Sequence, residues 1–192
     1  MFKAFLLLCI TILAVSGFCP APVLHSQRCS SLIVSSSSDG TPILDHEEPL
    51  SLIFKRAVML QRSGDHESAL KEYDMFIKAA KQLDVSPEMY SEVHINIGAA
   101  QIKNRNMEEA KYHFEQALEY RQIGKAYVNL AVLALQKASM SMNSSEGIAA
   151  LQEAKILCGR ALALNDDHQS TVTANRLIDD IDRMLQRTKG QN

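Results

Sequence analysis

The chain has 192 residues, of which 46% are hydrophobic and 22% are charged, a composition typical of one globular domain. Its 20 Lys and Arg residues stand against 22 Asp and Glu residues, so the formal net charge is −2 and no basic excess favours binding to a nucleic-acid backbone. Cys9, Cys19 and Cys29 all precede residue 30 and only Cys158 lies in the body, which excludes a disulfide framework in the folded part.

The first residues have the pattern of a secretory signal peptide. Lys3 precedes an apolar run from Ala4 to Val15, which is shorter than the roughly 20 residues that a membrane-spanning helix needs. Small residues then supply a cleavage site, so we predict a signal peptide over residues 1–17. The alternative is a retained membrane anchor, which the polar, Pro-containing segment that follows disfavours.

The residues around the predicted cleavage site suggest a second targeting step. The sequence Val15-Ser16-Gly17-Phe18-Cys19-Pro20 resembles the motif at the signal-peptide junction of plastid proteins in algae with complex, red-derived plastids, such as diatoms; Phe18 and Pro20 match it. The stretch from Ala21 to Ser38 is rich in Ser and has no acidic residue, as transit peptides do. We therefore expect residues 18–44 to be a disordered, transit-peptide-like segment and the chain to reach the plastid (chloroplast) through the secretory pathway. Secretion, or retention in the secretory pathway, is the alternative.

The body over residues 47–188 has the pattern of an all-α domain. Pro becomes rare, and apolar residues recur at helical spacing. Residues that favour turns divide it into segments of helix-pair length. These breaks are Ser63-Gly64-Asp65, Asp84 to Pro87, Asn104-Arg105-Asn106, Gly124, and Ser139 to Gly147. We expect the last of them, residues 139–147, to be a flexible loop, and residues 189–192 to be a short tail.

The helix pairs repeat a pattern of small and large residues. Ile97-Gly98 is followed by Ala110, Phe114 and Ala117, and the same spacing recurs from Ala57 to Ala69, Tyr73 and Phe76. In the third pair, Leu130-Ala131 is followed by Ala154, Cys158 and Ala161, with 11 extra residues in or beside the turn. This pattern resembles the tetratricopeptide repeat (TPR), in which small residues let two helices approach closely. The resemblance covers about residues 51–166, and the third repeat departs from it because Cys158 replaces the usual aromatic residue. It implies an α-solenoid of three antiparallel helix pairs.

A further helix is expected to cover the C-terminal end of this stack. Over residues 169–187, an apolar stripe includes Leu177, Ile178 and Ile181, while Asp179, Asp180 and Asp182 are expected to point away from it. Such a segment suits the capping helix that a repeat stack needs.

No pattern in the sequence indicates catalysis, a metal or a cofactor. His66, His94, His113 and His168 lie in different segments without the spacing of metal ligands. Cys158 lies among apolar residues with no base near it in sequence, so an enzyme that uses it is the weaker alternative. The pairs Glu108-Glu109 and Asp166-Asp167 lie at expected helix starts, where carboxylates favour the helix dipole.

The TPR resemblance implies a concave groove lined by the first helix of each pair. Apolar residues would lie along its middle and amide and basic groups at its edge, which favours a polypeptide partner with apolar anchors and acidic flanks. The alternative is that some of the apolar residues pack under the capping helix or the loop. The expected groove residues are Phe54, Lys55, Val58, Arg62, Ile95, Asn96, Ala99, Ile102, Lys103, Lys125, Val128, Asn129 and Val132.

The function expected from the sequence is therefore protein binding. The TPR domains that clamp acidic chaperone tails use Lys, Asn and Arg on these helices; Asn96 and Lys125 match, but Phe54, Val58 and Asn129 do not. We instead expect an adaptor or assembly factor, in keeping with plastid members of the family that assemble photosynthetic complexes, and we expect no small-molecule substrate. The alternatives are an obligate structural subunit of a larger complex and a secretory-pathway adaptor.

Overall fold

A computed structural model describes residues 49–141 and 144–189 of the chain. The predicted signal peptide, the transit-peptide-like segment and the end of the tail lie outside these residues. Within them the chain is all helical, as the sequence predicts. The helices are α2 (Leu50–Ser63), α3 (His66–Ala80), α4 (Pro87–Lys103), α5 (Met107–Tyr120), α6 (Gly124–Met140), α7 (Ser145–Leu164) and α8 (His168–Lys189).

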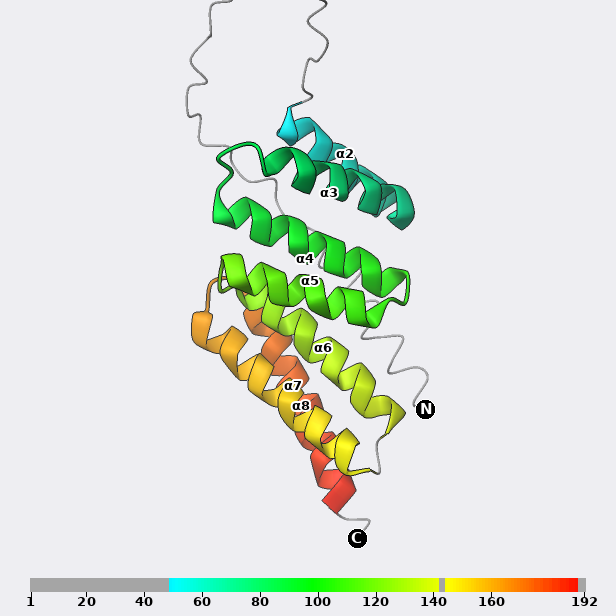
Figure 1. The fold of residues 1–192 in the computed structure, drawn as a ribbon. Coiled ribbons are helices and arrows are strands. Elements are labelled where there is room, and N and C mark those ends of the chain that lie inside the picture. The colour runs from blue at the N-terminus through cyan, green and yellow to red at the C-terminus, as the bar shows by residue number, and fades with distance from the viewer. Residues whose placement is uncertain (1–48, 142–143, 190–192) are drawn as a thin grey trace, which may run out of the picture.

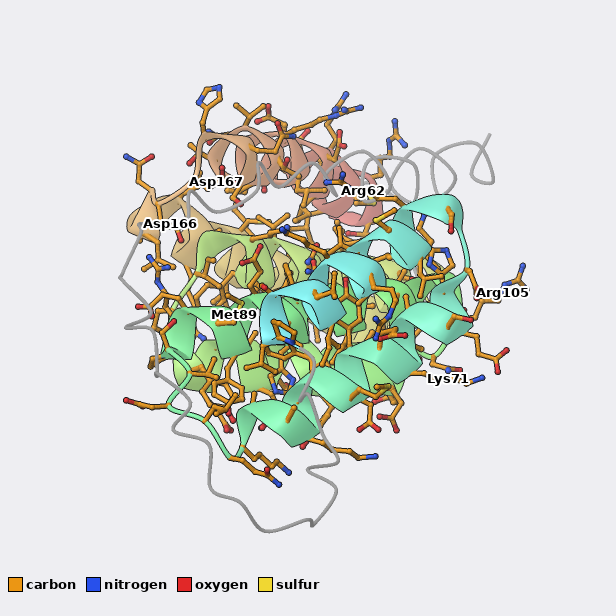
Figure 2. All side chains as sticks on the ribbon, turned by 90° about the horizontal axis from the view of Figure 1, so that it is seen from above. Arg62, Lys71, Met89, Arg105, Asp166 and Asp167 are labelled. Carbon is orange, nitrogen blue, oxygen red and sulfur yellow. The ribbon has the colours of Figure 1, made fainter. Side chains whose placement is uncertain are left out.

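The helices stack as successive antiparallel pairs, which is the arrangement of a helical solenoid (Figure 1). The pairs are α2–α3, α4–α5 and α6–α7, and α8 packs on α7 and α6 at the C-terminal end. Seen from the α2 end (Figure 2), α2 and α3 lie nearest the viewer, and they carry the labelled residues Arg62 and Lys71.

The repeated small and large residues form the core of each pair, as predicted. Ala57, Ala110 and Ala154 are all fully buried, because each lies where the two helices of a pair approach each other. Tyr73, Phe114 and Cys158 are equally buried and fill the space beside them. Cys158 thus takes the place of an aromatic ring in the third pair.

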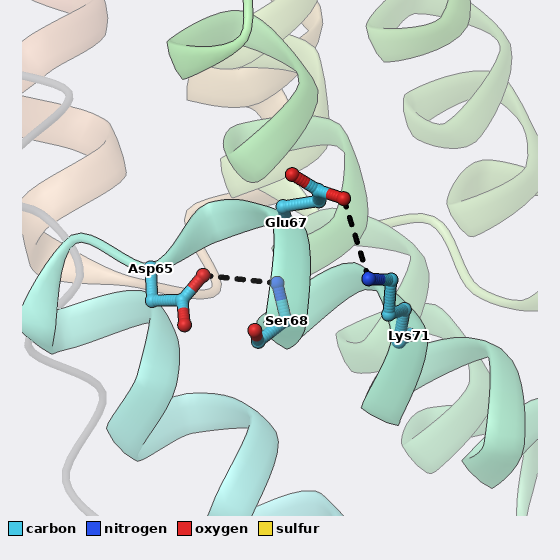
Figure 3. A network of polar contacts seen from close by, with 4 residues as sticks. All are labelled: Asp65, Glu67, Ser68 and Lys71. Atoms are coloured by element: carbon cyan, nitrogen blue, oxygen red, sulfur yellow. Dashed lines mark hydrogen bonds and ion pairs between the residues drawn. The ribbon is translucent and has the colours of Figure 1, made fainter.

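The turn between α2 and α3 shows how the sequence ends one helix and begins the next. Gly64 adopts a left-handed conformation with φ of 90°, which a Gly takes at little cost at a helix C-terminus. The Asp65 carboxylate then accepts a hydrogen bond from the Ser68 N–H over 3.1 Å and caps α3 (Figure 3). One turn on, Lys71 pairs with Glu67 on the solvent side.

Two predicted boundaries differ from the structure. Ser145, Glu146 and Gly147 belong to α7, because the Ser144 hydroxyl accepts a hydrogen bond from the Gly147 N–H and caps that helix. The interval between α6 and α7 is therefore shorter than the predicted loop 139–147, and the extra residues of the third pair lengthen its helices. In the first pair, α3 ends at Ala80, before the break predicted from Asp84 to Pro87.

The capping helix is found where the sequence predicts it. Leu177 and Ile181 of α8 are buried against the third pair, together with the partly buried Ile178. One expectation was wrong: Asp180 is only 8% exposed and pairs with Arg183, one turn along the same helix. The Arg183 guanidinium explains how a carboxylate is accommodated at this depth.

Candidate functional site

The candidate site is the surface formed by the first helix of each pair, α2, α4 and α6. These helices contact one another along the stack, α2 against α4 and α4 against α6. The expected groove residues lie on them, and the structure divides those residues into an accessible group and a buried group.

The accessible group lies mainly on the first two pairs. Lys55 and Arg62 of α2 are exposed, and the other accessible side chains are half-buried. We call this set the α2–α4 surface, with Lys125 at its edge on α6. Its half-buried members are Phe54, Val58, Asn96, Ala99, Lys103 and Lys125.

The remaining residues of the expected groove belong to the core. Ile95 and Ile102 pack in a cluster with Phe114 and Leu130 and are 1% and 6% exposed. They therefore have no free face for a partner. In α6, Val128 and Val132 are buried in a core cluster that also contains residues of α7 and α8. Asn129, between them, is also buried.

A polar network ties the three helices beneath the α2–α4 surface together. The Tyr73 hydroxyl of α3 donates a hydrogen bond to Gln61 Oε1 of α2 over 2.6 Å, and Gln61 Nε2 donates to the Asn96 backbone carbonyl of α4 over 3.4 Å. Burial, assisted by the charge of Glu92, raises the pKa of Tyr73 well above its ordinary value, so the hydroxyl keeps its proton. The network fixes α2 and α4 side by side.

Positive charge gathers at one end of this surface. Burial lowers the pKa of His66 at the start of α3, and the positive charge of the Lys103 ammonium contributes to the same shift. Lys103, at the C-terminal end of α4, therefore lies near the α2–α3 turn. Arg62 lies in the last turn of α2, next to the same turn. An anionic group on a partner would meet both cations here.

The same separation of charge extends over the whole stack. The second helices α3, α5 and α7 carry nine Asp or Glu residues against five Lys or Arg. On the first helices only Glu88 and Glu92 are acidic, whereas the basic residues are Lys55, Arg56, Arg62, Lys103, Lys125 and Lys137. Acidic and basic residues alternate along the sequence, but they lie on different helices of each pair. The row of first helices is therefore basic and the row of second helices is acidic.

The structure also contains a histidine pair that the sequence analysis missed. His94 of α4 and His113 of α5 share a hydrogen bond between their Nδ1 atoms over 2.9 Å. Their rings stack, and His94 also stacks on Tyr120, which in turn stacks on Tyr90. Burial, followed by the effect of His113, lowers the pKa of His94 to about 4, and burial lowers that of His113. Both imidazoles are therefore neutral at pH 7.

The pairing of α4 with α5, and no pattern within one helix, produces this cluster. Gly98 and Phe114 meet across the two helices, which fixes their antiparallel register. One turn before Gly98, that register brings His94 toward the residues that follow Phe114, among them Tyr120, whose ring stacks on His94. Spacing within a single helix, on which metal-site patterns depend, could not reveal it.

In the part of the chain that the structure describes, no three His, Cys, Asp or Glu residues are grouped so that they could hold a metal ion. Burial raises the pKa of the Cys158 thiol to about 12, so it stays protonated and unreactive at pH 7. Across residues 49–141 and 144–189, no helix is both long enough and apolar enough to span a membrane.

No family model matches the chain, and neither the curated proteins nor the solved structures contain a match.

Proposed function

We propose that this chain is a tetratricopeptide-like adaptor that binds an acidic segment of another polypeptide on its α2–α4 surface. The observation that carries the proposal is the separation of charge between the rows of first and second helices. Exposed surface charges contribute little to the stability of a fold, so folding alone does not require them to be sorted. A basic row beside accessible apolar side chains suits a partner with apolar anchors and acidic flanks.

The accessible residues fit a short segment rather than a long one. Phe54 and Val58 supply apolar contacts on α2, and Ala99 leaves room beside them on α4. Lys55, Arg62 and Lys103 surround this apolar area. Because α8 covers the corresponding residues of α6, the bound segment would lie over the first two pairs.

The test is affinity capture of the C-terminally tagged chain from native cells, followed by mass spectrometry. The variant Ala99→Asp/Lys103→Glu changes the α2–α4 surface, and Ala163→Asp/Lys111→Glu makes the same changes at exposed positions of α7 and α5. We expect the first variant to lose the captured protein and the second to retain it, with equal thermal unfolding. Retention by both variants would show that the α2–α4 surface is not the binding site.

The same experiment addresses location and the alternative role. A mature N-terminus near residue 40 with plastid partners would support an assembly factor of the plastid, whereas a start at Phe18 with secretory-pathway partners would contradict that address. An obligate structural subunit is the alternative, favoured by the exposed apolar residues Leu52 and Met59 of α2. It predicts a chain that is insoluble without its partner, while an adaptor purifies alone.

A further inference from the structure

The N-terminal end of the stack has an apolar face that no described helix covers. On α2, Leu52 is 49% exposed and Met59 is 70% exposed, and on α3 Met75 is 47% exposed. The terminal helix of a repeat stack ordinarily presents a polar outer face to water. At the C-terminal end, α8 presents such a polar face. At the other end, the outer face of α2 and α3 is partly apolar.

These three residues share one face of the first pair. Arg56 of α2 and Glu72 of α3 form an ion pair over 2.6 Å, which marks the line along which the two helices meet. Residues three or four apart lie on the same face of a helix. Leu52 lies four residues before Arg56 and Met59 lies three after it, while Met75 lies three residues after Glu72. All three side chains therefore lie beside that line. We call Leu52, Arg56, Met59, Glu72 and Met75 the end face.

The charges beside the end face are unbalanced. On the α3 side, Lys71 pairs with Glu67 and Lys78 pairs with Asp74. On the α2 side, Lys55 and Arg62 have no carboxylate partner among the described residues, and α2 itself contains no acidic residue. Figure 2 looks down on this end of the stack, with Arg62 on α2 and Lys71 on α3.

The other end of the same stack shows how such a face is covered. There α8 lays an apolar stripe, including Leu177 and Ile181, against the last pair. Asp182 of α8 then bonds Lys155 of α7 over 2.6 Å at the side of the stripe. An amphipathic helix with a carboxylate on its flank is thus the chain's own means of covering a terminal pair.

We propose that the end face binds an amphipathic helix of a partner protein, with an apolar stripe over Leu52, Met59 and Met75 and acidic residues toward Lys55 and Arg62. A helix suits this face because the backbone of α2 and α3 is already hydrogen-bonded and offers no free groups to a partner, whereas a helix satisfies its own backbone groups. Methionine side chains adapt readily to such a partner. A second copy of the chain is a poor occupant, because a symmetric contact would bring the two basic α2 helices together. The apolar residues Leu52, Met59 and Met75 are not part of the α2–α4 surface, whereas Lys55 and Arg62 are shared with it.

The proposal is tested with a fluorescently labelled synthetic helix added to the full chain. The peptide carries a Leu stripe at helical spacing, Glu on one flank and Gln on the other; a second peptide has Lys in place of Glu. We expect saturable binding of the Glu peptide by fluorescence anisotropy and at least about tenfold weaker binding of the Lys peptide.

Matched variants locate the binding site. Leu52→Ser/Met59→Ser should weaken binding of the Glu peptide by at least about tenfold, whereas Met140→Ser, at a Met that is 77% exposed on α6, should leave it unchanged. Lys55→Glu/Arg62→Glu should abolish the preference for the Glu peptide, and Lys137→Glu should not. Ala99→Asp should have no effect, so failure of the α2–α4 proposal and failure of this one can be told apart.

Three outcomes would overturn the proposal. The first is equal binding of the Glu and Lys peptides, or a loss of Glu-peptide binding in Met140→Ser as large as that in Leu52→Ser/Met59→Ser. The second is a molecular mass in sedimentation that falls from dimer to monomer on Leu52→Ser/Met59→Ser, which would make a second copy the occupant. The third is a photoreactive methionine analogue at position 59 of the full chain that cross-links only to residues of the same chain or to lipid vesicles.

Discussion

At the centre of the second helix pair, the backbone of Gly98 lies against the buried ring of Phe114. A Cβ atom at Gly98 would come within 2.5 Å of a ring carbon, closer than any real Cβ contact. Overpacking of this kind costs about 1–3 kcal/mol, and better helix propensity returns about 1 kcal/mol. We therefore expect Gly98→Ala to lower the free energy of unfolding by up to about 2 kcal/mol in urea titrations.

The chain offers a matched control for this substitution. Gly159 lies on the exposed side of α7, where a Cβ would meet nothing within 4 Å. Gly159→Ala should stabilise the protein by about 0.5–1 kcal/mol. Phe114→Leu in the Gly98→Ala background should recover part of the loss, because it removes the clashing ring atoms. Without such recovery, the contact with Phe114 does not explain the effect.

The pair of His94 and His113 makes stability depend on pH. Burial holds the pKa of both imidazoles below the unfolded value of about 6.5, and that of His94 at about 4. The unfolded chain therefore binds more protons between these values, so stability is full above pH 6.5 and is lost as the pH falls toward 4. For His94 the loss is about 2–3 kcal/mol over that interval.

The histidine prediction is checked by urea unfolding between pH 7.5 and 4.5. In His94→Phe, which keeps an aromatic ring beside Tyr120, we expect the larger part of the decline in stability to disappear, because the imidazole with the more strongly lowered pKa is gone. The Glu109 charge, which raises the pKa of His113, is unchanged in this variant. His168→Gln, at an exposed position, should leave the decline as it is in the native chain. The same pH profile in both variants would exclude the pair as its cause.

At the scale of the helices, one carboxylate links the third pair to the capping helix. Both oxygens of Asp166, in the turn before α8, accept from the Gly124 N–H at the start of α6, over 3.2 and 3.0 Å. A Cβ at Gly124 would lie 2.6 Å from Asp166 Oδ1, so a larger residue there would displace the carboxylate. The contact satisfies an N–H that the helix itself leaves without a partner.

Removing this cap should have a measurable effect. We expect Asp166→Ala to lower the free energy of unfolding by about 1 kcal/mol, the usual loss for a helix N-cap. Asp179→Ala, on the exposed side of α8, serves as the control and should change it by less than about 0.5 kcal/mol. If the two substitutions lowered the free energy of unfolding equally, the removal of a negative charge, and not the loss of the cap, would explain the effect.

The helices and their cores could be predicted from the sequence because their causes are local. Small residues such as Gly98 and Ala110 recur at a fixed spacing, and Gly64 and Asp65 end one helix and begin the next whatever surrounds them. The accessible surface could not be predicted in the same way, since the burial of Val132 depends on how α6 packs with α7 and α8. The histidine pair, and the separation of basic first helices from acidic second helices, also depend on how the helices pair, which the sequence of one helix does not show.

For the molecule as a whole, the packing order implies that stability is shared between neighbours. The first pair meets the rest of the stack through α4, and α8 meets it through α6 and α7. In such a stack, each pair is stabilised by its own core and by the interfaces with its neighbours. A loss of stability at one end should therefore affect the neighbouring pair less and the far end of the stack least.

Ile181→Ala tests this view of the stack. Ile181 is fully buried between α8 and the third pair, so its truncation should cost about 2–4 kcal/mol, with Ile156→Ala, at an Ile that is 60% exposed on α7, as the near-neutral control. Native-state hydrogen exchange should show faster opening in α6, α7 and α8, with smaller changes in α4 and α5 and the least in α2 and α3. An equal loss of protection in every helix would instead identify one cooperative unit. The end face on α2 and α3 would then be sensitive to changes at α8, whereas a graded response leaves that face intact when the opposite end opens.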